Sequence, residues 1–237
     1  MTAGAWAGEG DPLVRAFGRT LVVAPHPDDE VLGAGGTIAR LARGGGWVGV
    51  AVVTTGRPPR FALEGVGRVR REAEDAHGTL GVAETLWLDL PAAELGEVPH
   101  ADLNAALADA FARTAPDTIL VPHPGDIHRD HGEVFTAALV AARPTGPVHP
   151  RRILAYETLS ETNWNAPYLT PAFQPQVHVD IAHTLGAKVE AMACFASQIR
   201  QFPNERSIEA IRALATLRGA GVHLPAAEGF VSVREVL

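Results

Sequence analysis

Two short stretches of this chain combine histidine with carboxylates. The first is His26-Pro27-Asp28-Asp29-Glu30 and the second is His128-Arg129-Asp130-His131. Each follows a short apolar run, at 21–24 and 118–121, and each precedes a segment with helical apolar spacing. Imidazole and carboxylate groups are the ligands that a catalytic zinc ion takes from proteins. Together the two stretches predict a metal-dependent active site.

The first stretch offers side chains with different tasks. Pro25 and Pro27 restrict the backbone on both sides of His26, so its position is well defined. His26 and Asp29 lie three residues apart and can converge on one point, whereas Asp28 faces another direction. A simpler interpretation is that the two aspartates only cap the following helix, but a cap does not require His26. We therefore expect His26 and Asp29 to supply two of the three protein ligands of a catalytic zinc ion.

The second stretch places two imidazoles beside one carboxylate. Because neighbouring residues on an irregular turn diverge, His128 and His131 need not serve the same purpose. One can complete a His-Asp-His metal set, and the other can face the substrate while Asp130 orients its ring. Alone, this stretch is equally compatible with a solvated surface loop. Its position at the end of a second strand, matching the first stretch, favours the site.

The segments between these stretches indicate an α/β protein. Apolar runs predict strands at 20–24, 47–54, 84–88, 118–121, 153–156 and 176–179. Amphipathic segments predict helices at 28–43, 68–80, 100–114, 133–142, 184–201 and 207–218. This alternation is typical of a Rossmann-like fold, a mostly parallel sheet with helices on both faces. Right-handed crossovers would then bring both polar turns to the carboxyl ends of the strands.

Length and composition narrow the classes of function. The 237 residues suit a single domain, 1–237, in which 1–18 form a loose N-terminal lead-in. A net charge of −7 argues against a nucleic-acid partner. A single cysteine, Cys194, excludes an intrachain disulfide and suits a reducing compartment. The sequence has no signal-peptide pattern and no apolar run long enough to span a bilayer, so we expect a cytoplasmic protein without a membrane partner. The composition is also compatible with a homo-oligomer.

The sequence resembles the PIG-L/LmbE-like family of zinc-dependent deacetylases, which act on N-acetylglucosaminides and related N-acyl amines. The strongest similarity lies in APHPDDEVLGAGG at 24–36 and HPGDIHRDH at 123–131. It continues in YETLSETNW at 156–164, the segment 188–198, RSIEAIR at 206–212 and AEGF at 227–230. The family motif usually opens Ala-His-Pro, whereas here Pro25 stands between Ala24 and His26. We expect this insertion to alter the backbone slightly without displacing the ligands.

The resemblance implies a role for each polar residue of the two stretches. His26, Asp29 and His131 would bind Zn²⁺, and Asp28 would be the general base. Water activated by the metal would attack the amide of a small N-acetylated sugar or glycoside. A protonated His128 would stabilise the oxyanion, with Asp130 keeping the ring oriented and cationic.

Three further residues are candidate substrate contacts. Arg70 is favoured because the family often carries an arginine shortly before the glutamate that corresponds to Glu72, although a solvated helix face explains Arg70 equally well. Asp126 flanks the second stretch and could line the pocket or only shape the turn. Glu228 belongs to the AEGF similarity but could be a lone surface residue.

Two other functions remain open at the level of sequence. The protein could be a metal-binding or regulatory module with a structural zinc ion, although structural sites are usually closed by four ligands. It could also be a zinc hydrolase of another amide or of an ester. Substrate specificity would reside in the loops at 55–67, 91–99 and 160–175.

Overall fold

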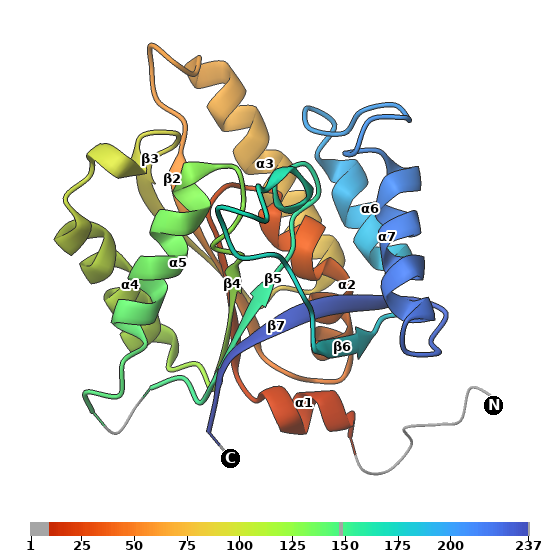
Figure 1. The fold of residues 1–237 in the computed structure, drawn as a ribbon. Coiled ribbons are helices and arrows are strands. Elements are labelled where there is room, and N and C mark those ends of the chain that lie inside the picture. Colours follow the sequence, from red (N-terminus) through yellow and green to blue (C-terminus); the bar gives the residue numbers. More distant parts are fainter. Residues whose placement is uncertain (1–9, 147–148, 237) are drawn as a thin grey trace.

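Within residues 10–146 and 149–236, which the computed structural model describes, seven strands form one central sheet (Figure 1). Their order across the sheet is β3-β2-β1-β4-β5-β7-β6. The strands are β1 (Thr20–Ala24), β2 (Val48–Thr55), β3 (Glu84–Pro91), β4 (Thr118–Pro122), β5 (Arg152–Tyr156), β6 (Val177–Asp180) and β7 (Ala227–Glu235). Strands β1 to β5 pair in parallel, whereas β7 is antiparallel to β5 and β6. The predicted α/β class with a mostly parallel sheet is confirmed.

Helices cover both faces of this sheet (Figure 1). They are α1 (Pro12–Phe17), α2 (Asp29–Arg43), α3 (Leu63–Leu80), α4 (His100–Thr114), α5 (Arg129–Ala141), α6 (Leu185–Cys194) and α7 (Ile208–Ala220). Buried residues of α2, α3, α6 and α7 form one apolar cluster with Val22 and Ala24 of β1. Those of α4 and α5 form the other cluster with Leu21 and Val23. Successive side chains of β1 therefore point into opposite cores, as the period of a strand requires.

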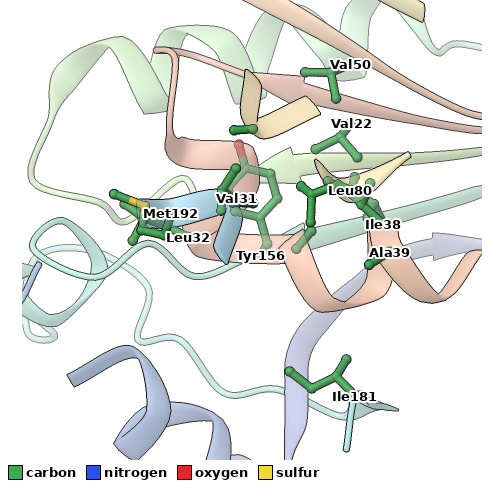
Figure 2. Packing of buried hydrophobic residues seen from close by; sticks show 14 of the residues in the cluster. Val22, Val31, Leu32, Ile38, Ala39, Val50, Leu80, Tyr156, Ile181 and Met192 are labelled. Carbon is green, nitrogen blue, oxygen red and sulfur yellow. The ribbon is translucent and has the colours of Figure 1, made fainter. Parts of the chain in front are cut away.

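Two glycines of helix α2 let neighbouring side chains approach its backbone closely. A Cβ added at Gly33 would lie 2.2 Å from the ring of Tyr156, and one at Gly36 would lie 2.8 Å from Ile181. Glycine in a helix costs roughly 0.5–1 kcal/mol relative to alanine. Here that cost permits close packing: Tyr156 belongs to the same buried cluster as Val31 of α2 (Figure 2), and its hydroxyl donates to the carbonyl of Val23 at 2.8 Å. The first turn of α2 is thereby fixed against β1.

Several elements differ from the sequence-based expectations. Residues 12–17 form helix α1 although the sequence predicted a loose lead-in, because Asp11 accepts a capping hydrogen bond from the amide of Leu13. Residues 1–9 of that lead-in lie outside the described residues. Strand β7 was not predicted; only its first half is buried, so its apolar pattern is short. Helix α6 ends at Cys194 rather than at residue 201.

The start of α5 is the difference that matters for function. The sequence predicted a helix from residue 133, but α5 begins at Arg129 with His128 as its N-cap. Asp130 and His131 therefore lie on a regular helical turn and not on an irregular loop. Among the described residues, no helix is both long and apolar enough to cross a membrane.

Candidate metal centre and active site

The two polar stretches meet at the carboxyl ends of neighbouring strands. Strand β1 pairs in parallel with β4, with Val22 opposite Leu120, so the turns that follow both strands lie at the same edge of the sheet. The chain order reverses between these two strands, since β2 and β3 extend the sheet on one side and β5 on the other. Open α/β sheets bind ligands at such a switch point.

The turn after β1 is held by backbone contacts that orient His26. The carbonyl of Pro25 accepts hydrogen bonds from the amide and the hydroxyl of Thr54, at 3.1 and 2.8 Å. The inserted Pro25 thus anchors the turn to β2. The amide of His26 donates to Oδ2 of Asp29 at 2.9 Å. This bond turns the Asp29 carboxylate back toward the imidazole.

Three side chains converge on one point. Oδ2 of Asp29 lies 3.2 Å from Nδ1 of His26 and 3.3 Å from Nε2 of His131. Two ligand atoms of a tetrahedral zinc ion with bonds of about 2.0–2.1 Å lie about 3.3 Å apart. Nε2 of His131 is buried and makes no hydrogen bond to any described residue. The donor types and their spacing therefore fit a metal ion.

Asp126 supports this cluster from behind. Its Oδ2 lies 2.7 Å from Nδ1 of His131, and its Oδ1 accepts a hydrogen bond from the hydroxyl of Thr162 at 2.6 Å. The Asp126 side chain is fully buried. A carboxylate on the second nitrogen of a metal-binding histidine fixes its tautomer and ring orientation. The prediction that Asp126 contacts substrate is therefore corrected: both of its oxygens are used inside the protein.

The role expected for Asp130 also changes. Its Oδ2 lies 3.0 Å from Nε2 of His26 and accepts the amide of Ala93 at 2.7 Å. The carboxylate therefore orients His26 and not His128 as the sequence suggested. The hydrogen bond between His128 and Asp130 uses the backbone of Asp130 and not its carboxylate. Nδ1 of His128 accepts the Asp130 amide at 3.2 Å, which caps α5. The start of α5 at Arg129 produces this arrangement.

His26, His128 and Asp130 make a second set of groups close enough for a metal ion.

These contacts shift the pKa values of the three imidazoles. Burial lowers the pKa of His26, but the hydrogen bonds to Asp130 and Asp29 raise it to about 9. Burial likewise opposes the charged form of His131, yet Asp29 and Asp126 raise its pKa to about 10. Burial and the nearby His26 charge lower the pKa of His128. Burial therefore opposes the cationic form of His128 that the sequence suggested.

Asp28 has an unusual backbone and an unusual acidity. Its φ of 116° lies in the left-handed region, which a residue with a side chain adopts at a cost of order 1–3 kcal/mol. Its side chain makes no helix-capping hydrogen bond, so the capping interpretation does not hold for this residue. Instead Oδ2 accepts a hydrogen bond from Arg206 at 2.6 Å. Burial raises the pKa of Asp28 to about 7, against the lowering effect of Arg206.

A buried polar chain holds this strained backbone. The amide of Asp28 donates to Oε2 of Glu30 at 3.1 Å. The other oxygen of Glu30 lies 3.1 Å from Nε2 of His77 in α3, and Nδ1 of His77 lies 2.8 Å from the hydroxyl of Thr85 in β3. Sequence reasoning gave Glu30 no role, because its function depends on a histidine 47 positions away.

A cavity of about 510 Å³ opens beside the cluster, lined by residues of both polar stretches. Asp28, His26 and His128 line one part of it. Arg70 lines another part, with its guanidinium 4.3 Å from the centre of the Trp87 ring and paired loosely with Glu74 and Asp89. A ligand in this cavity could therefore contact Arg70, as the sequence predicted.

Two cavity residues were missed at the sequence level. Arg206 pairs with Asp28 and, at 3.6 Å, with Glu161, and both Arg206 and Glu161 line the cavity. The signal was present, since Arg206 begins the RSIEAIR stretch and Glu161 lies within YETLSETNW. Neither stretch contains a metal-ligand pattern that would reveal a functional role.

Glu228 lies elsewhere, and its predicted substrate contact is corrected. The residue is 4% exposed and does not line this cavity. Its carboxylate accepts the amides of Gly36 and Thr37 in α2, at 2.9 and 2.7 Å, and pairs with Lys188 at 2.6 Å. Glu228 therefore links β7 and α6 to the middle of α2.

Comparison with known proteins places this site in a family. The family model described as PIG-L, GlcNAc-PI de-N-acetylase, matches residues 21–142, slightly more than half of the chain. This segment contains all three predicted metal ligands together with Asp28, His128 and Asp130.

Relatives and solved structures match a larger share of the chain. An uncharacterized deacetylase of Escherichia coli, YaiS, is 33% identical over 66% of this chain and 78% of its own length. The 2'-N-acetylparomamine deacetylase of Streptomyces fradiae is 30% identical over 76% of this chain and 74% of its own. The crystal structure of the conserved protein TT1542 from Thermus thermophilus superposes with a TM-score of 0.74 at 29% identity, covering 92% and 96% of the two chains. With this family match and these relatives, the chain belongs to the PIG-L family.

Proposed function

We propose that this protein is a metal-dependent hydrolase that removes the acetyl group from an N-acetyl amino sugar or its glycoside. The observation that carries the proposal is the convergence of His26, Asp29 and His131 on one point beside a cavity that Asp28 also lines. The deacetylase activity named for relatives such as the paromamine enzyme supports the same reaction.

His26, Asp29 and His131 would hold the metal ion, and we propose zinc. Their imidazole and carboxylate donors suit zinc, and three protein ligands leave a position open for water or substrate. Bound there, zinc supplies Lewis acidity: it polarises a carbonyl and lowers the pKa of water to about 7. Asp126 and Asp130 would keep the two histidines oriented for this task.

Asp28 is the proposed general base. Its buried carboxyl, with a pKa raised to about 7, is suited to exchange a proton near neutral pH. Arg206 hydrogen-bonds its Oδ2 and so fixes the orientation of the carboxylate. The proton taken from attacking water would reside on Asp28 and then pass to the departing amine.

His128 is the proposed donor to the acetamide oxygen. Its Nδ1 accepts the Asp130 amide, so the neutral ring carries its proton on Nε2. A hydrogen-bond donor placed where negative charge develops typically contributes 10²–10³ in kcat. This role does not need the cationic ring that the sequence suggested.

The alternatives differ in what they require of these side chains. A structural zinc site would give Asp28 and His128 no task, whereas both line a cavity. Hydrolysis of another amide or of an ester would use the same residues on a different substrate. We place the protein in the cytoplasm, which its single cysteine supports, and cell fractionation tests that assignment.

The deciding experiment is an acetate-release assay. Zinc-loaded protein is incubated with a panel of N-acetyl amino sugars, their glycosides, and matched O-acetyl esters and other N-acyl amines. Mass spectrometry detects the free amine or alcohol, and Asp28→Asn serves as the inactive control. Release of amine from an N-acetyl sugar supports the proposal. Exclusive cleavage of esters, or metal binding without turnover of any panel member, contradicts it.

A further inference from the structure

The cavity beside the metal ligands has an uneven distribution of charge. Its two lining carboxylates, Asp28 and Glu161, lie around Arg206, which pairs with both of them. The segment from Thr54 to Arg70 contributes three further arginines and no carboxylate to the lining. The net charge of the chain is −7, so a segment of cavity wall in which every charged side chain is positive is an unexpected feature.

The three arginines Arg60, Arg68 and Arg70 differ in how their charge is balanced. Arg60 pairs with Glu94 at 3.2 Å, with both side chains about half exposed. Arg70 has loose pairs with Glu74 and Asp89, and its guanidinium lies over the ring of Trp87. Arg68 is exposed, lines the cavity, and forms no ion pair or hydrogen bond with any described residue.

Such weak internal partners can be exchanged for a ligand. Exposed ion pairs contribute only about 0–1 kcal/mol, so a ligand anion can replace the pair of Arg60 at little cost. An arginine without an internal partner has all five N–H donors available. Guanidinium groups bind carboxylates and phosphates with two parallel, charge-assisted hydrogen bonds. A neutral hydroxyl group does not offer this paired interaction and is bound more weakly.

We infer that the substrate carries an anionic substituent, a carboxylate or a phosphate, remote from its acetamide group, and that Arg68 and Arg60 bind it. The inference rests on the proposed deacetylase function and specifies its substrate class. The acetamide would lie at the metal end of the cavity, beside Asp28 and His128. The cavity of about 510 Å³ is within the range of 300–1,000 Å³ typical of ligand pockets, so it can hold a sugar with a substituent.

Two matched substrate pairs test the inference and separate the two anions. The first pair is the N-acetylglucosaminide of glycolic acid and the isosteric glycolamide glycoside. The second is N-acetylglucosamine 1-phosphate and its neutral dimethyl ester. For at least one pair, wild-type kcat/KM should favour the anionic member on the order of 10- to 100-fold, the value of a charged hydrogen bond. The pair that shows the larger ratio identifies the anion.

Variants assign the preference to the arginine wall. In Arg68→Gln the ratio of kcat/KM between the members of the preferred pair should fall toward one, and in Arg60→Gln/Arg68→Gln it should fall further. The matched control is Arg71→Gln, which removes another exposed arginine, about one helical turn from Arg68, that does not line the cavity. In this control the ratio should stay at the wild-type value.

Binding to the Asp28→Asn variant separates this inference from the proposed function. Calorimetric dissociation constants for the same pairs do not require turnover. If the anionic members bind more tightly but no acetate is released by wild type, the anion site stands and the deacetylase proposal fails. If the members of each pair bind and react equally, or if Arg68→Gln and Arg60→Gln/Arg68→Gln keep the wild-type ratio, the inference is overturned.

Discussion

Two buried polar clusters contact helix α2, one at its middle and one at its first turn, and they differ in whether all their polar groups have partners. In the middle of the helix, Glu228 accepts two backbone amides of α2 and pairs with Lys188, whose ammonium also donates to the carbonyl of Leu32. Both oxygens and the ammonium group thus have partners. At the start of the helix, Asp29 faces His131 of α5, whose Nε2 has no hydrogen bond to a described residue. The N-cap residue of α2, Asp28, holds a left-handed backbone.

The difference separates structural from functional polar groups. A buried polar group that satisfies its partners rigidifies the fold, whereas one left unsatisfied costs about 1–3 kcal/mol and needs another explanation. The Glu228 cluster connects β7, α6 and α2, and both oxygens of the Glu228 carboxylate already accept hydrogen bonds within the protein. The first-turn cluster is incomplete within the protein, and a metal ion and a substrate would complete it. Variants in the two clusters should therefore affect different properties.

The largest expected effect belongs to Asp28. Asp28→Asn should lower kcat by about 10²–10⁴, the usual contribution of a general base. Metal content should stay near that of wild type, because Asp28 is not among the converging ligands. Thermal stability should not fall, since the substitution removes a carboxylate whose burial opposes ionisation. Elemental analysis, calorimetry and steady-state kinetics check the three statements; loss of the metal would instead place Asp28 among its ligands.

Glu228→Ala should show the reverse pattern. It leaves the buried charge of Lys188 unpaired, a change that typically costs about 3–5 kcal/mol of stability. Activity per folded molecule should remain within a few-fold of wild type. Chemical denaturation measures the loss in free energy of unfolding.

Replacing both partners is the matched control. In Glu228→Gln/Lys188→Met neither charge remains, so much of the lost stability should return. A double variant as unstable as Glu228→Ala would show that the hydrogen bonds to α2, and not the ion pair, determine the effect.

Metal affinity should depend steeply on pH. His26 and His131, with pKa values raised to about 9 and about 10, must each lose a proton before their nitrogens can bind a cation. Below about pH 9 the apparent affinity should therefore rise with pH, by up to about 100-fold per unit if both protons are released. Competition titrations with a chelator between pH 6 and 8 measure this slope. A flat dependence would contradict the release of protons from His26 and His131 on metal binding.

The smallest effect is expected for Glu30. Glu30→Gln replaces the carboxylate that accepts the Asp28 amide and faces His77, so it should weaken the positioning of the general base. A charged hydrogen bond is typically worth about 1.5–3 kcal/mol, and the amide of glutamine retains part of it, so a loss of roughly 10-fold in kcat with KM little changed is expected. A change confined to KM would show that Glu30 acts on substrate binding instead.

The sequence alone determined the fold class and predicted that His26, Asp29 and His131 lie together. Alternating apolar and amphipathic segments specify a parallel sheet, and local spacing places His26 and Asp29 on one turn, since both signals act over a few residues. The chemistry of the proposed metal ligands depends on their own side chains and is local too. By contrast, the paired partner of Asp28 is Arg206, 178 positions away, and no local pattern encodes that contact.

Only the tertiary structure decided which carboxylate serves which histidine. The sequence paired Asp130 with His128 because they are neighbours, but a helix that begins at Arg129 turns the Asp130 carboxylate toward His26 in the turn after β1. Likewise, Asp126 and Glu228 were predicted to face substrate, whereas packing buries both and uses their oxygens internally. Partners of a charged group depend on which surfaces the fold brings together, and that information is distributed over the whole chain.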